Sequence, residues 1–323
     1  MAGKQTDFGI LLPTRGLLLE AQDTHENPDP SRIFVMAKKI EELGYQSIWV
    51  GDSLLARPRL DALATLAAVG AVTEKPKLGT CVYLPAMRNP LLLAQTTATV
   101  DFLTNGRLIF GIGIGSRVAD YYFEWVALGI QPEKRTKRMV HVVELLKKLW
   151  TGEPVDSDSE FFPFKNARLL PTPTQKPGVP IWFATGHGRF IPAQYARLVR
   201  LGEGAMMNLD MPWEFKQHVE NIKKECDKQK RDPATIDLCM YLSLTLGNDQ
   251  KKATEEGEGF LTKYYIRNWW EGRWGPYGPP QVLIDRINEF KEAGARSFVI
   301  RFCSYDQMGQ LDWFTRDVWP HCR

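Results

Sequence analysis

Short apolar runs alternate with longer amphipathic stretches along most of the chain. In the stretch 31–44, Ile33, Ala37 and Ile40 share one helical face, and the closing glycine suits a helix C-cap. Eight apolar runs have the length of strands: 8–13, 47–52, 77–84, 108–115, 181–186, 204–208, 237–246 and 297–302. Strands that are apolar on both faces and separated by helices pair in parallel, so we expect an α/β fold. The eight units predict a closed (β/α)8 barrel, with an open doubly wound sheet as the competing arrangement.

The intervening amphipathic stretches predict helices at 31–44, 60–72, 89–105, 191–201, from 213 to about 230, and at 281–293. Two segments break the alternation. The segment 151–180 carries six prolines and is too long for an ordinary connection, so we expect an excursion over the barrel. The segment 264–277 carries six aromatic residues, which either pack on the core or a second subunit, or wall an aromatic substrate pocket. We therefore expect a single domain over 1–323, with excursions at about 151–180 and 260–280.

Composition narrows the class of protein. With 44% hydrophobic residues, the 323-residue chain has enough apolar surface to fold, and its net charge of +3 does not favour nucleic acid as a partner. No apolar run reaches about 18 residues, and the N-terminus lacks the features of a signal peptide, so we expect neither a membrane nor secretion. The five cysteines are scattered and the five histidines form no metal-binding pattern. We expect a cytoplasmic protein without disulfides or a metal.

Polar residues at the carboxyl ends of the predicted strands mark the expected site, because function in a parallel barrel belongs there. Asp52 is the one carboxylate at these ends, and its alternative role is an N-cap or the partner of an arginine. The other ends carry glycines, hydroxyls, amides and arginines, which suit a large planar anionic cofactor. Gly186 and Gly188, just before a helix, are candidates for holding a phosphate. Arg57 and Arg59 are interpreted as solvated charge.

A family resemblance follows from the stretch LGTCVYLPAMRNPLLLAQTTATVDFLTNGRLIFGIGIG at 78–115. It resembles the bacterial luciferase-like family of flavin-dependent oxidoreductases, and further matches lie at 42–53, 135–155, 171–186, 196–206 and 290–302. The resemblance implies a TIM barrel with an insertion after the strand-4 helix, and reduced FMN or coenzyme F-420 (F420) as cofactor. It also implies a non-proline cis peptide bond at about Cys81–Val82, and a homodimer.

Two departures from the family pattern affect the expected chemistry. Many members carry His after the strand-2 Asp, and deazaflavin-dependent sugar-phosphate dehydrogenases of the family carry Glu after the strand-4 glycines; this chain has Ser53 and Ser116 there. The catalytic candidates are Asp52, Ser53 and Ser116. The cofactor-binding candidates are Cys81, Val82, Tyr83, Gly113, Gly115, Arg117, Thr185, Gly186, His187, Gly188 and Arg189. The substrate-pocket candidates are Trp49, Trp269, Trp270 and Trp274.

These residues predict a flavin-dependent oxidoreductase that acts on a small organic substrate. Our first hypothesis is a monooxygenase that uses reduced FMN and O2, because the cofactor then carries the chemistry for which acid–base residues are scarce. The first alternative is hydride transfer with F420. The second is a barrel that binds flavin without turnover.

Overall fold

Eight parallel strands close into a barrel in the computed structural model, which describes residues 6–116, 119–268 and 272–323. The strands are β1 (Asp7–Leu11), β2 (Ser47–Val50), β3 (Lys77–Thr80), β4 (Leu108–Ile112), β7 (Ile181–Gly186), β8 (Gly204–Asn208), β9 (Asp237–Leu246) and β11 (Ser297–Phe302). They follow the order β9-β11-β1-β2-β3-β4-β7-β8, and β8 pairs with β9 to complete the ring. The predicted closed barrel is therefore confirmed, and the open sheet is excluded.

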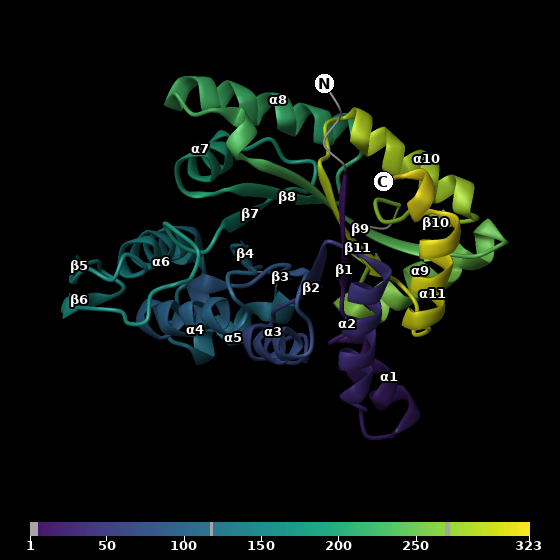
Figure 1. Cartoon of the computed structure of the whole chain (residues 1–323), viewed down its shortest axis with the longest axis horizontal. Helices are drawn as coiled ribbons and strands as arrows, with labels where there is room; N and C mark the ends of the chain where they lie inside the picture. The colour runs from purple at the N-terminus through teal and green to yellow at the C-terminus, as the bar shows by residue number, and fades with distance from the viewer. Residues whose placement is uncertain (1–5, 117–118, 269–271) are drawn as a thin grey trace.

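Helices surround this barrel (Figure 1). They are α1 (Gly16–Thr24), α2 (Ser31–Leu43), α3 (Ala62–Ala71), α4 (Pro90–Leu103), α5 (Ala119–Ala127), α6 (Arg135–Leu149), α7 (Pro192–Leu201), α8 (Pro212–Gln229), α9 (Gln250–Tyr265), α10 (Pro280–Glu292) and α11 (Gln307–Asp317). All six predicted helices are present to within a few residues at each end. Helices α1, α5, α9 and α11 were not among the predicted elements, and α6 is the helix after strand 4 that the family resemblance implied. A short strand β10 (Tyr277–Gly278) pairs with the carboxyl end of β9.

The excursion after α6 contains an antiparallel hairpin, β5 (Val155–Asp158) and β6 (Pro163–Ala167). The hairpin lies at the edge of the molecule beyond α6 (Figure 1). Gln175 ties the end of the excursion to α4, since its backbone N–H and its side-chain amide both donate to the carboxylate of Asp101. The predicted insertion therefore sits outside the barrel and leaves the strand ends uncovered.

The barrel interior is plugged by two tryptophans whose ring centroids lie 5.4 Å apart, Trp49 on β2 and Trp182 on β7. Trp49 is 1% exposed and donates from its ring N–H to Ser47 Oγ at 2.7 Å. Glycines make room for it, because a Cβ atom at Gly9 or Gly79 would overlap the indole. Trp49 was expected to wall a substrate pocket; the structure instead places it in the closed interior, where its ring fills space that neighbouring strands leave empty.

Among the described residues, no helix is long and apolar enough to span a bilayer.

Arg107 fastens the amino-terminal side of the barrel, just before β4. Its side chain is 9% exposed and donates to the backbone carbonyl groups of Gly70, Thr73, Pro76 and Thr104. These carbonyls belong to the ends of α3 and α4 and to the approach to β3. Arg107 therefore joins two helices and a strand at the face of the barrel where we expect stability rather than catalysis.

We predict that Arg107→Met lowers the free energy of unfolding by about 2–4 kcal/mol, because four buried carbonyl groups lose a charged donor. Urea denaturation measures the change. Arg200→Met is the control, since Arg200 is exposed and pairs with Glu144 on the surface; it should change stability by less than about 0.5 kcal/mol. Equal losses in the two variants would contradict the anchoring role.

Candidate functional site

The inward-facing positions at the carboxyl ends of β2, β3, β4 and β7 form a shallow surface, which we call the floor: Gly51, Cys81, Val82, Gly113 and Ala184. A Cβ atom added to Gly113 would lie 2.7 Å from Cγ2 of Val82 and 3.8 Å from Cβ of Ala184. One added to Gly51 would lie 3.5 Å from the Cys81 carbonyl oxygen. Val82 and Ala184 are partly exposed. Gly51, Cys81 and Gly113 are buried, so solvent reaches the floor at the ends of β3 and β7.

The chemistry of the floor is neutral. The peptide bond between Cys81 and Val82 is cis, as the family resemblance implies. Burial raises the pKa of the Cys81 thiol well above its ordinary value, so this thiol stays protonated at neutral pH and is not a nucleophile. A side chain at Gly51 or Gly113 would stand in the space above the floor. These features fit a planar ring lying against backbone and small side chains.

A cluster of arginines and tyrosines borders the floor on the side of β9, β11 and β1. We call it the arginine–tyrosine cluster: Arg15, Arg57, Arg59, Arg301, Tyr264 and Tyr265. Arg301 points inward from β11 and is 3% exposed. Its Nε and Nη2 donate to Ser243 Oγ at 3.0 and 2.6 Å, and its Nη1 donates to the Tyr265 hydroxyl at 2.8 Å. Its guanidinium carbon lies 4.7 Å from the centre of the Tyr264 ring.

Arg57 and Arg59 come to this cluster from the loop after β2. The Arg57 guanidinium lies 4.2 Å from the ring centre of Tyr121 and 4.4 Å from that of Tyr265. Arg59 Nη1 donates to the Tyr264 hydroxyl at 3.3 Å. The expectation that these two arginines are solvated surface charge was wrong, because both are partly buried between aromatic rings. The loop turns them inward, which a local charge pattern does not show.

Trp274 completes the aromatic side of the mouth. Its ring stacks on Tyr265 at 5.2 Å between centroids and lies 5.0 Å from the Arg301 guanidinium. The aromatic segment 264–277 thus reaches the carboxyl ends of the strands, as its interpretation as the wall of a substrate pocket requires. Trp269 and Trp270 lie outside the described residues.

Asp52 is held by Arg88, whose Nη2 donates to both carboxylate oxygens at 2.8 and 3.1 Å. The backbone N–H of Leu84 donates to the same carboxylate at 3.0 Å. Burial raises the pKa of Asp52 above its ordinary value, while Arg88 and the Leu84 N–H act to lower it. The arginine partner that we considered as an alternative for Asp52 is therefore present. It ties the end of β2 to the turn after β3.

The loop after β7, expected to hold a phosphate, uses its backbone N–H groups internally. The N–H of His187 donates to the Asn208 carbonyl at 3.3 Å, and that of Gly188 donates to Asp210 Oδ1 at 2.7 Å. Gly186, His187 and Gly188 all have positive φ angles, of 105°, 65° and 61°. Both N–H groups therefore have their acceptors within the structure around this tight turn, and neither needs an anion as its acceptor. The side chain of Arg189 at the same strand end is exposed.

The remaining candidates lie around these groups. Ser53 Oγ accepts from the Arg57 N–H at 3.1 Å, and the Ser116 carbonyl accepts from the Trp125 indole at 2.8 Å. Tyr83 packs behind the barrel wall, 5.3 Å from Phe110. The hydroxyl of Thr185 is buried and has no hydrogen-bond partner among the described residues, and Gly115 lies beside Trp125 with a φ of 72°. Arg117 is outside the described residues. Within those residues, no group of His, Cys, Asp and Glu suits a metal.

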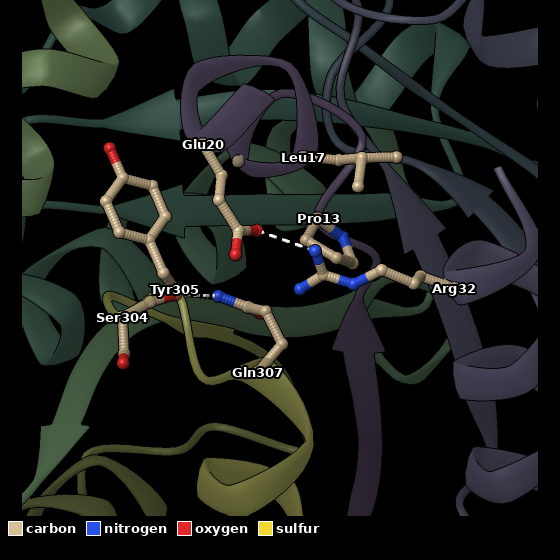
Figure 2. A pocket seen from close by; sticks show the side chains of 8 residues that line it. Pro13, Leu17, Glu20, Arg32, Ser304, Tyr305 and Gln307 are labelled. Atoms are coloured by element: carbon tan, nitrogen blue, oxygen red, sulfur yellow. Dashed lines mark hydrogen bonds and ion pairs between the residues drawn. The ribbon is translucent and has the colours of Figure 1, made fainter. Parts of the chain in front are cut away.

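A small cavity lies on the outer side of the rim, between α1 and the segment after β11 (Figure 2). Its volume is about 10 Å³, and Glu20 and Arg32 pair across it at 2.7 Å. This space suits about one water molecule. It is too small for an organic ligand, so this cavity is not the candidate site.

The arginine–tyrosine cluster is the part of the site that sequence reasoning missed. Arg301 lies in the apolar run SFVIRF. Successive side chains of this strand alternate between the barrel interior and the surrounding helices, and Arg301 is at an interior position. An arginine at an inward position near a carboxyl strand end was an available signal. The contacts of Arg57 and Arg59 with residues 264 and 265 had no such signal, because they join segments about 200 positions apart.

Comparisons with known proteins agree with this architecture. Residues 6–273 match the family described as luciferase-like monooxygenase. An F420-dependent glucose-6-phosphate dehydrogenase of Nocardia farcinica is 30% identical over 291 residues, which cover 81% of this chain and 83% of that enzyme. Among solved structures, an F420-dependent secondary alcohol dehydrogenase has a TM-score of 0.78 at 22% identity, covering 99% of this chain and all of that one. A monooxygenase from Streptomyces bottropensis has a TM-score of 0.80 at 20% identity, covering 98% and 99%.

The closed ring of eight parallel strands and the helices around it define a (β/α)8 barrel. The chain belongs to the luciferase-like monooxygenase family, a family that also includes the F420-dependent dehydrogenase just described.

We predict that Gly186→Ala lowers the free energy of unfolding by about 1 kcal/mol more than Gly129→Ala. Both glycines have positive φ, 105° at Gly186 and 67° at Gly129, so both substitutions carry a backbone cost, which is larger at Gly186 because 105° lies outside the left-handed helical region. A Cβ at Gly186 would also overlap Asp210 Oδ2, whereas one at Gly129 meets open space. Urea denaturation of the two variants measures the difference. Equal losses would show that the contact between Gly186 and Asp210 does not constrain the turn.

Proposed function

We propose that this chain is an oxidoreductase that binds F420 on the floor and transfers a hydride between the coenzyme and a small organic substrate. The observation that carries the proposal is the surface of backbone and small side chains that Gly51, Gly113, Ala184 and the Cys81–Val82 peptide form at four neighbouring strand ends. The named relative that is 30% identical to this chain is F420-dependent, which supports F420 over FMN.

The residues around the floor would orient the ring and limit its exposure to water. Gly51 and Gly113 place no side chain of their own on the floor, and Trp49 and Trp182 close the barrel beneath it. Arg59 extends over Gly51 and would overlap a Cβ there, so its side chain must shift if a ring covers that end. When bound, F420 supplies two-electron hydride chemistry. The floor carries no charged side chain, so this chemistry belongs to the coenzyme.

The FMN-dependent monooxygenase that we first expected receives less support. The solved monooxygenase that resembles this chain is 20% identical, which supports the shared fold. The alternative of a barrel that binds flavin without turnover is favoured by the positions where Ser53 and Ser116 replace ionisable residues. Anaerobic turnover separates the three: hydride transfer proceeds without O2, a monooxygenase stops, and a binding protein gives no product.

We predict that the full chain binds F420 with micromolar affinity and that Gly113→Ala weakens this binding about tenfold, which is about 1.4 kcal/mol. The added methyl group would overlap Cγ2 of Val82, so it or the displaced Val82 side chain would lift a ring from the floor. Coenzyme fluorescence measures the affinity. Gly259→Ala is the matched control, because a Cβ there meets nothing within 4 Å. Equal affinity of Gly113→Ala and the parent chain would contradict a ring on the floor, and a failure of the parent chain to bind F420 would overturn the proposal.

We also propose that the chain forms a homodimer through α4. The solvent-facing positions of this helix carry no charged residue: Leu91, Leu92, Gln95, Thr96, Thr99, Phe102 and Leu103. Leu92, Phe102 and Leu103 are 66%, 60% and 62% exposed. An uncharged row along a helix of 14 residues is suited to an identical surface of a second copy.

We predict that Leu92→Glu shifts the chain from dimer to monomer in light scattering coupled to size-exclusion chromatography, because the carboxylate would be buried against its symmetry mate. Val35→Glu is the control, since Val35 on α2 is 56% exposed; it should leave the mass unchanged. A monomeric parent chain, or a dimer that survives Leu92→Glu, would refute this interface.

A further inference from the structure

We infer that the arginine–tyrosine cluster is a binding site for the anionic group, a carboxylate or a phosphate, of the substrate. The inference rests on the proposed function in one respect: the cluster borders the floor on which the coenzyme is proposed to lie. Four guanidinium groups, from Arg15, Arg57, Arg59 and Arg301, meet there around two phenol rings.

Within the described residues, the positive charge of the cluster has no carboxylate partner. None of the ion pairs between residues in the described part of the chain includes any of the four arginines. Their hydrogen bonds go to carbonyl groups and hydroxyls, such as the Tyr264 carbonyl for Arg15 and Ser243 for Arg301. Buried charge is costly without a counter-charge. An anion placed among these groups would supply it.

Burial and the neighbouring charges shift the pKa values of groups in the cluster. Burial lowers the pKa of Arg57 to about 10 and that of Arg15 to about 10. Burial also acts to raise the pKa of Tyr264, but Arg59, Arg301 and Arg15 together bring it below its ordinary value. A phenol whose ionisation is favoured in this way reports a positive potential at its oxygen. The same potential attracts the anionic part of a ligand.

Donor groups remain available for such a ligand. Nε of Arg57 is buried and has no hydrogen-bond partner among the described residues. Arg59 Nη1 makes a long hydrogen bond of 3.3 Å to Tyr264 and lies over Gly51, at the edge of the floor. Guanidinium groups bind carboxylate and phosphate in a planar, bidentate way. An anion held by Arg57 and Arg59 would therefore anchor a substrate whose other end lies above the floor.

The cluster is separate from the loop after β7 that we expected to serve the coenzyme phosphate. That loop belongs to β7 and β8, whereas the cluster is built from β11, α9 and the loops after β1 and β2. Since F420 also carries anionic groups, the test must distinguish substrate from coenzyme.

The test is isothermal titration calorimetry of the full chain with inorganic phosphate, against a chloride background of equal ionic strength. We expect saturable binding with a Kd of about 1 mM or tighter. Arg59→Gln should weaken it at least about fivefold, because it removes one charged donor. Arg200→Gln is the matched control and should leave it unchanged, since Arg200 lies on the surface beside Glu144. Circular dichroism confirms that the variants fold, and Arg57→Gln provides a second variant from the same loop.

The coenzyme arm repeats the titration with the chain saturated with F420. Phosphate binding that persists, together with an F420 affinity that changes less than about threefold in Arg57→Gln, supports a substrate site. Absence of saturable phosphate binding overturns the inference, and so does binding that the arginine variants do not weaken. Phosphate binding that F420 abolishes assigns the cluster to the coenzyme and also overturns it. If F420 does not bind but phosphate binds through Arg59, the proposed function fails while the anion site stands.

Discussion

The site of this protein depends on the alternation of side chains along eight parallel strands that close into a ring. Closure leaves no free edge and brings every carboxyl strand end to one rim. Each inward position then competes for the same narrow interior. Trp49 and Trp182 fill its middle, and the glycines at 9 and 79 leave room for the Trp49 ring. The small residues of the floor lie above the plug, so a flat ligand can rest there without entering the barrel.

The two sides of the rim have opposite characters because their strand ends carry different inward residues. At the carboxyl ends of β2, β3, β4 and β7 these residues are small, and they create surface without charge. On β9 and β11 they are Tyr241, Ser243 and Arg301, which project into the mouth. A neutral platform beside a positively charged wall orients a ligand that has an apolar reacting part and an anionic part. The neutral side therefore suits the proposed coenzyme, and the positively charged side suits the proposed anionic substrate.

The sequence was sufficient to predict the barrel and its rim, because both follow from local patterns. All eight apolar runs became strands of the ring, and the short excursion with six prolines became the hairpin region outside it. The cis bond at Cys81–Val82 followed from the family resemblance. Side-chain direction was less accessible. Trp49 was assigned to a pocket wall although the strand period sends it into the closed interior, and Asp52 was a catalytic candidate although Arg88, 36 positions away, engages it.

The cluster could not be predicted from local patterns, since loops separated by most of the chain form it. Arg57 and Arg59 follow β2, whereas Tyr264 and Tyr265 end α9. Only the closed ring brings these segments together.

The most direct measurement of the central claim is a crystal structure of the chain with F420. The account predicts density for a planar ring against Gly51, Gly113 and the Cys81–Val82 peptide, with Arg59 displaced from its position over Gly51. Density at another face of the barrel, or a floor unchanged at saturating coenzyme, would contradict it.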